Sequence, residues 1–170
     1  MADNEIRDVF ILGLRNAHAM ENQALSIMKP QLSRIENYPE VAAKLEQHIR
    51  ETEGQITRIE EVLEGLDEDH STLKDMALSF TGAMAAMGHT MAGDEILKNS
   101  FANFAFENFE IAAYKSLLTV ADAGGFATAT AALQSNLAEE EAMAKWLDDN
   151  LAAVTQKFLM LREGGATAKV

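Results

Sequence analysis

The sequence has no cysteine, only two prolines and few aromatic residues among its 170 positions. Without cysteine, the chain can form no disulfide, no thiolate metal site and no iron–sulfur cluster. Basic residues are also scarce, with 14 Lys and Arg against 27 acids and a formal net charge of −13. This balance argues against binding to nucleic acid or to an anionic membrane surface, because both require basic patches. No apolar run approaches the length of a membrane span.

The composition indicates a folded helical protein. Hydrophobic residues make up 48% of the chain, so a core is expected rather than a disordered acidic segment. Ala, Leu, Met, Glu and Lys, which favour helices, dominate, and no segment shows the alternation of a strand. The N-terminal stretch MADNEIRDVF is acidic and lacks the basic start of a secretory signal. A cytoplasmic location is therefore expected.

Apolar residues at three-four spacing predict four long helices. Their expected bounds are about residue 4 to beyond Met28, 39–65, 93–122 and 126–160. Pro39 suits the first turn of the second helix, and the stretch 66–92 is a long crossover expected to contain a short helix. Two antiparallel pairs joined by one long crossover are typical of a ferritin-like four-helix bundle. We expect this all-α domain to span 1–162, followed by a flexible C-terminal tail at 163–170.

Two acids interrupt the apolar stripes of these helices. Glu140 lies between Leu137 and Ala144 in the stripe of the fourth helix, and Glu21 lies among apolar residues of the first. A lone buried carboxylate is costly unless a partner or a cation offsets its charge. A Lys, an Arg or a Tyr hydroxyl could serve as that partner. Few cations share these stripes, however, so the bundle interior is expected to hold something positive.

An internal echo extends the pair of acids to four. Glu21 and Glu51 are 30 residues apart, as are Glu110 and Glu140, and a shift of 89 residues superposes the first pair on the second. In helices joined by a tight turn, residues at similar distances from the turn face each other. The echo therefore predicts that carboxylates from all four helices meet at a similar depth.

Two further residues lie on the same helix faces. His48 precedes Glu51 by three positions, and Glu107 precedes Glu110 by three. The Glu-x-x-His motif of di-metal bundles is absent, because Gly54 takes the place of the histidine that would follow Glu51. An oxygen-rich set with an imidazole suits Fe or Mn, with Zn also possible. A neutral His48 bonded to a carbonyl or to Glu51, and a supporting role for Glu107, are the alternatives.

Several segments resemble the YciF-type bacterial stress proteins, a ferritin-like family without an established function. They are RDVFILGL, the Glu21 stretch, 46–52, 54–60, 107–114 and 137–141. The resemblance covers about 5–150 and is weakest at 66–92. It implies a di-metal site at Glu21, Glu51, Glu110 and Glu140, with His48 and Glu107 close by.

Three functions follow as hypotheses. The first, which we prefer, is a metal-binding stress protein with two iron ions per chain, or with Mn or Zn in their place. The second is a di-iron or di-manganese oxidoreductase acting on peroxide or dioxygen. The third is a metal-free structural bundle that associates through its Phe-rich third helix. A homodimer is the expected assembly.

Overall fold

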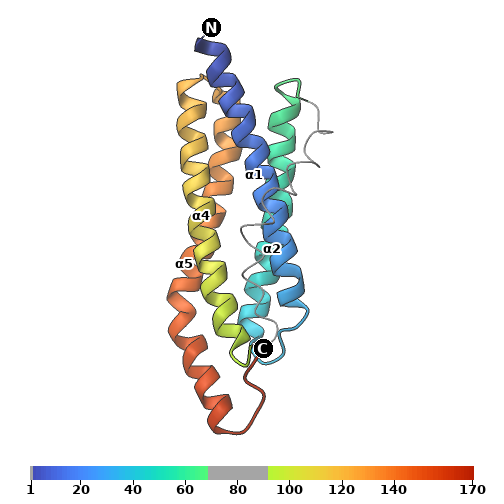
Figure 1. Ribbon diagram of the computed structural model, residues 1–170, viewed down its shortest axis with the longest axis vertical. Coiled ribbons are helices and arrows are strands. Elements are labelled where there is room, and N and C mark those ends of the chain that lie inside the picture. Colours follow the sequence, from blue (N-terminus) through green and yellow to red (C-terminus); the bar gives the residue numbers. More distant parts are fainter. Residues whose placement is uncertain (1, 69–91) are drawn as a thin grey trace.

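The chain folds into a bundle of four long helices. The computed structural model describes residues 2–68 and 92–170, with side chains from Glu5 onward, and within these ranges every regular element is a helix. The helices are α1 (Ala2–Leu32), α2 (Pro39–Glu64), α4 (Glu95–Ala123) and α5 (Ala127–Glu163). Figure 1 shows α1 with α2 and α4 with α5 as two antiparallel pairs. The predicted all-α four-helix bundle is confirmed, while the short helix expected in the crossover falls outside the described residues.

Local signals account for the two tight turns. Pro39 is the first residue of α2, where a missing N–H costs no helical hydrogen bond. Gly125 turns the chain from α4 into α5 with φ 71°, a left-handed conformation that glycine adopts without steric penalty. Pro30, in contrast, lies inside α1, which continues to Leu32. The ends of the helices therefore lie close to the positions that the sequence predicts.

The core is built from the apolar stripes of all four helices. Phe10 of α1 stacks on Phe126 at the turn before α5, with ring centroids 4.4 Å apart. Leu14 and Leu133 are almost fully buried in the same cluster, and each such side chain contributes about 1.5–3 kcal/mol of burial energy. None of the described helices has an apolar stretch sufficient to cross a bilayer. This packing holds the four helices in a fixed register around buried polar side chains, among them Glu21, His48 and Glu140.

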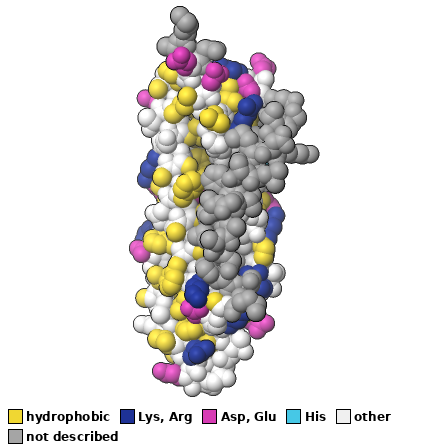
Figure 2. All heavy atoms as spheres, viewed as in Figure 1, with side chains coloured by type: hydrophobic (Ala, Val, Ile, Leu, Met, Phe, Trp, Pro, Cys, Tyr) yellow, Lys and Arg dark blue, Asp and Glu magenta, His cyan; other side chains and the backbone are white. Residues whose placement is uncertain are grey.

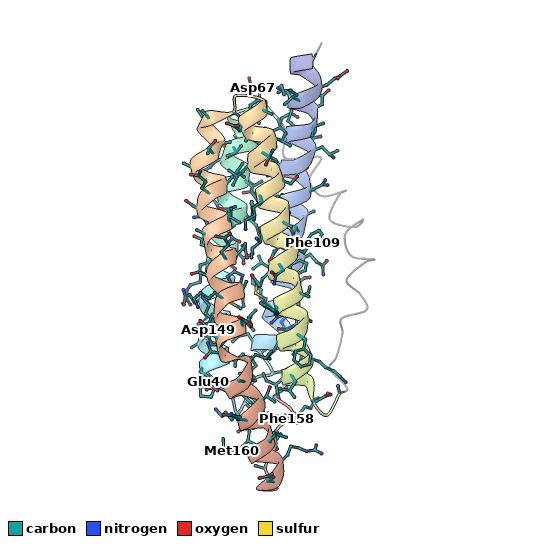
Figure 3. All side chains as sticks on the ribbon, turned by 90° about the vertical axis from the view of Figure 1, so that its left-hand side faces the viewer. Glu40, Asp67, Phe109, Asp149, Phe158 and Met160 are labelled. Atoms are coloured by element: carbon teal, nitrogen blue, oxygen red, sulfur yellow. The ribbon has the colours of Figure 1, made fainter. Side chains whose placement is uncertain are left out.

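Some apolar side chains remain on the outside. Phe101 and Phe109 of α4 are 53% and 49% exposed, although that helix is apolar on most sides. Figure 3 shows Phe109 about midway along α4, and Phe158 and Met160 on the lower part of α5. α4 is therefore buried along one part of its surface and open along another.

The C-terminal residues make specific contacts with the rest of the bundle. Figure 1 shows α5 extending past the other helices and the chain turning back toward them. The Tyr38 hydroxyl donates to the backbone carbonyl of Ala168 at 2.7 Å. The backbone amide of Ile96 donates to the backbone carbonyl of Lys169 at 2.9 Å. Lys169 also pairs with the buried Glu95 at 3.2 Å. The flexibility expected for 163–170 stays a prediction, and any such motion has to break these contacts.

Candidate metal centre

Four buried side chains meet in the middle of the bundle. His48 comes from α2, Glu107 and Glu110 from α4, and Glu140 from α5. Each offers one ligand atom, and these four atoms lie within 4.8 Å of one another. All four residues are at most 2% exposed. The three-residue spacing of Glu107 and Glu110 places both on one face of α4, so a single helix supplies two carboxylates. We call these four residues the central cluster.

The imidazole of His48 contacts three carboxylates. Its Nδ1 lies 3.1 Å from Glu51 Oε2, and its Nε2 lies 3.3 Å from Glu107 Oε2 and 3.4 Å from Glu140 Oε2. Burial lowers the pKa of His48, but the contacts with Glu107, Glu140 and Glu51 outweigh it and raise the pKa to about 12. In return, the bond from His48 lowers the pKa of Glu51. In the absence of another cation, His48 is therefore the positive charge of the site.

Several carboxylate oxygens of the site are buried without a hydrogen-bond partner. They are both side-chain oxygens of Glu110 and of Glu140, together with Oε2 of Glu21 and Oε2 of Glu107. Among them, Oε2 of Glu107 and Oε2 of Glu140 have only the ion-pair contacts of 3.3 and 3.4 Å with His48. Buried polar atoms are nearly always paired in native proteins, so such a group requires an explanation. Within the described ranges, no Lys or Arg forms an ion pair with the three acids of the central cluster. The donor set and its unpaired oxygens fit a bound cation.

Burial also changes the protonation of these acids. It is the main cause that raises the pKa of Glu21 and of Glu110 well above the usual value, followed by the charges of Glu140 and Glu21 respectively. Burial raises the pKa of Glu107 to about 8, although His48 opposes the shift. Without a cation, the site therefore retains protons near neutral pH. A metal ion would have to displace them.

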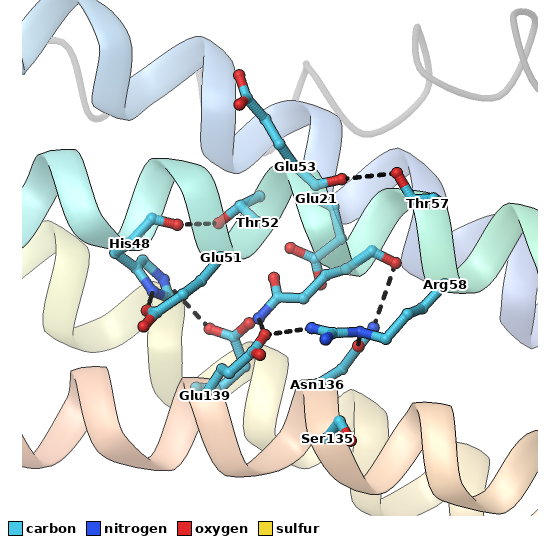
Figure 4. A network of polar contacts seen from close by, with 12 residues as sticks. Glu21, His48, Glu51, Thr52, Glu53, Thr57, Arg58, Ser135, Asn136 and Glu139 are labelled. Carbon is cyan, nitrogen blue, oxygen red and sulfur yellow. Dashed lines mark hydrogen bonds and ion pairs between the residues drawn. The ribbon is translucent and has the colours of Figure 1, made fainter.

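Glu21 is fixed by a chain of hydrogen bonds that reaches the bundle surface, and Figure 4 shows Asn136 and Arg58 close together at the outer end of that chain. The Tyr114 hydroxyl donates to Glu21 Oε1. Asn136 Nδ2 donates to that hydroxyl at 2.8 Å, and Arg58 Nε donates to Asn136 Oδ1 at 2.6 Å. Glu21, Tyr114 and Asn136 are all fully buried. Sequence analysis did not identify Asn136, although it lies four residues before Glu140 on the same helix face and could have been found as a second polar residue there.

The six predicted site residues occupy three kinds of position. His48, Glu107, Glu110 and Glu140 form the central cluster. Glu51 touches it through His48 and exposes 24% of its side chain at the solvent edge. Glu21 is fully buried and bonded to Tyr114, and it lies outside the group that shares the 4.8 Å limit. Their roles as metal ligands stay a prediction.

Comparison with known proteins identifies the family of this chain. Residues 5–160 match the family described as "Domain of unknown function (DUF892)". The chain belongs to the DUF892 family. Protein YciF of Escherichia coli K12 is 30% identical over 145 residues, which cover 81% of this chain and 84% of the relative. The resemblance to YciF-type proteins is thereby confirmed.

Solved structures of similar proteins share the fold of this chain. A crystal structure of a protein from Xanthomonas campestris pv. campestris matches with TM-score 0.78 and 30% identity, covering 93% of this chain and 99% of that one. The E. coli stress protein YciF matches with TM-score 0.73 and 28% identity, covering 86% and 94%. YcfI of Rhodopseudomonas palustris, proposed to be a structural protein, matches with TM-score 0.66 over 84% and 92%, and at 23% identity it shares the fold alone.

Proposed function

We propose that this DUF892 protein binds two iron ions in the middle of its bundle and acts in bacterial stress response. The observation that supports the proposal is the set of buried carboxylate oxygens without hydrogen-bond partners around one imidazole. If Glu21, Glu107, Glu110 and Glu140 are all ionised and His48 is charged, the site carries a net charge of −3. A protein interior stabilises such a charge only when cations neutralise it.

The donor types are compatible with iron. Carboxylates with one imidazole suit Fe(II) and Mn(II), and Zn(II) is also compatible. The central cluster would hold the first ion. Glu21 Oε2, which is free of hydrogen bonds, and the solvent-edge carboxylate of Glu51 would extend the donor set to a second. In this arrangement, the ions take the place of protons that the acids otherwise retain.

Biological context and assembly are part of the proposal. The stress role is supported by the relative YciF, which is named a stress protein. The absence of cysteine fits a reducing cytoplasm.

A homodimer is supported by apolar side chains on the outside, of which Val9 and Leu12 of α1 are 55% and 52% exposed. Figure 2 shows apolar side chains along one face of the bundle. Light scattering after gel filtration measures the assembly, and a monomeric mass would remove the dimer from the proposal.

An oxidoreductase is the second candidate. The observation that favours it is the partial exposure of Glu51, because it gives the buried site one edge at solvent. Bound iron or manganese would supply the redox chemistry for a peroxide or dioxygen substrate. The residues of the chain would hold the ions, and the dry interior would exclude bulk water. Peroxide consumption equal to that of free iron, and unchanged in Glu140→Ala, would reject this candidate.

Metal content tests the main proposal. After expression with ample iron and anaerobic purification, we expect about two Fe per chain, as in di-metal bundles of this type. Glu107→Gln should lose metal, because it removes a charged donor from the central cluster. Glu95→Gln is the matched control, since Glu95 is an equally buried acid of α4 that pairs with Arg34 and Lys169 instead. A wild-type protein that stays metal-free, with a melting temperature unchanged by Fe(II), would support the structural bundle.

A further inference from the structure

The chain Arg58–Asn136–Tyr114–Glu21 has a direction that the chemistry of its donors determines. A guanidinium only donates hydrogen bonds, so the Asn136 atom that faces Arg58 must be the amide oxygen. The amide nitrogen of Asn136 then faces the Tyr114 hydroxyl and donates to it. A hydroxyl has one proton, and with its oxygen accepting from Asn136, that proton is left for Glu21 Oε1.

The other end of the chain is also fixed. Arg58 pairs with Glu139, and Glu139 Oε2 accepts from Gln55 Nε2 at 3.0 Å. Asn136 Nδ2 additionally lies 3.4 Å from the backbone carbonyl of Gln55. A flip of the Asn136 amide would place its nitrogen against the Arg58 guanidinium and its oxygen against that carbonyl. The surroundings therefore permit one orientation.

This direction has a consequence for the two oxygens of Glu21. Oε1 accepts the hydrogen bond from the Tyr114 hydroxyl, whereas Oε2 is buried without a hydrogen-bond partner. Glu140, Glu107 and His48 all act electrostatically on Glu21, so its carboxylate lies near the central cluster. One oxygen is thus held in place by the protein, and the other is left available.

We infer that Tyr114 is a positioning residue that holds Glu21 with one oxygen ready for a cation, and that Asn136 and Arg58 fix the direction of its hydrogen bond. The inference rests on the proposed metal site and adds to it a support built from α2, α4 and α5. Groups that orient a ligand from behind commonly change metal affinity 10- to 100-fold when they are removed. Tyr114 touches no ion in this scheme and acts through Glu21 alone.

The test compares two tyrosines. Tyr114→Phe removes one buried hydroxyl and keeps the ring, and Tyr38→Phe does the same at an equally buried residue that bonds to Ala168 instead. Fe(II) affinity is measured anaerobically by competition with a chromophoric chelator. We expect Tyr114→Phe to weaken Fe(II) binding about 10- to 100-fold and Tyr38→Phe to stay within about twofold, the scatter expected for a distant, independent site. Equal affinities in the two variants would overturn the inference.

A double-mutant cycle separates positioning from a general structural effect. In a Glu21→Gln background, Tyr114→Phe should change the Fe(II) affinity by no more than about twofold, because the residue through which it acts is already altered. A loss as large as in the wild type would refute the role through Glu21. Should Tyr114→Phe fail to fold, Asn136→Leu removes the donor behind the tyrosine, and affinity equal to that of Tyr38→Phe would then overturn the inference.

The same experiment distinguishes this inference from the proposed function. If the wild type and Tyr38→Phe bind no Fe(II), the metal site itself is wrong, and the role of Tyr114 is rejected with it. If both bind Fe(II) and Tyr114→Phe binds it equally well, the metal site stands and only the positioning role is rejected.

Discussion

The metal-free protein should lose stability as the pH rises through neutrality. An acid whose pKa is raised on folding binds more protons in the folded than in the unfolded state, so stability falls with pH above its usual pKa. The pKa of Glu107 is raised to about 8, and those of Glu21 and Glu110 are raised well above the usual value. The pKa of His48 is raised to about 12, so its stabilising contribution is complete below its usual pKa and declines above it. All four groups act in the same direction.

The size of the effect follows from one group alone. Each extra proton held by the folded state changes the free energy of unfolding by about 1.4 kcal/mol per pH unit. Glu107 holds most of one such proton between about pH 6 and about pH 7.5, which gives a loss of about 2 kcal/mol. For a chain of this size, that corresponds to a fall in melting temperature of about 4–8 °C. Glu21, Glu110 and His48 increase it further.

Thermal melting with a chelator at constant ionic strength measures the effect. Glu107→Gln should fall less steeply with pH than the wild type. Glu95→Gln is the matched control, because Arg34 and Lys169 overcome the effect of burial and hold the pKa of Glu95 below its usual value. That variant should be less stable but keep the wild-type slope above about pH 6.

Excess Mn(II) should oppose the loss of stability. Bound cations keep the carboxylates ionised, so the stabilisation they provide grows as the competing protons leave. A metal-free melting temperature that stays level or rises between about pH 6 and about pH 7.5, with Glu107→Gln unchanged from the wild type, would refute this account of the buried acids.

Three further results are expected. Glu140→Gln should abolish Fe(II) binding, keep the circular dichroism of the helices and raise the metal-free stability, because it relieves repulsion with Glu21 and Glu110 while His48 keeps its contacts with Glu51 and Glu107; a large loss of helicity would contradict this. Deletion of 167–170 should cost about 2 kcal/mol in urea unfolding through its lost hydrogen bonds, and an unchanged midpoint would show that the tail contacts contribute nothing. Gly124→Ala should lower the free energy of unfolding by about 1–3 kcal/mol, since the added Cβ would lie 2.2 Å from the Phe126 ring. Gly54→Ala should raise it by up to about 1 kcal/mol, because the added Cβ meets no atom within 4 Å and alanine favours a helix. Equal melting temperatures of the two variants would contradict this.

The fold could be predicted because its signals are local. Three-four spacing of apolar residues, Pro39 at the start of a helix and Gly125 in a turn depend only on near neighbours in the chain. The contacts of the C-terminal residues could not be predicted in this way. Tyr38 and Ala168 are 130 residues apart, and the sequence GGATAK has the composition of a free tail. Such contacts depend on the path of the whole chain.

The site could be predicted in part, because a carboxylate in an apolar stripe is costly and therefore conspicuous. Glu21 and Glu140 were found by that reasoning, and both are fully buried. A neutral amide in a stripe costs less and is less conspicuous, which is why Asn136 was overlooked. Spacing alone also could not separate Glu51 at the solvent edge from Glu107 in the interior, since each lies three positions from another candidate. That difference arises from how the four helices are rotated against one another.

The 89-residue echo breaks down where the site becomes asymmetric. The echo pairs Glu107 with His18, but His18 bonds to Glu60 at 3.0 Å while Glu107 lies in the central cluster. It pairs His48 with Leu137, which supplies no ligand. The central cluster therefore concentrates an imidazole and three carboxylates at one position, whereas a second ion would depend on Glu21 and on shared oxygens. We expect the first ion to bind more tightly than the second, so that a stepwise Mn(II) titration shows two unequal affinities. A single step with two equivalent ions would mean that Glu51 and Glu21 contribute as much as the central cluster, against the geometry found here.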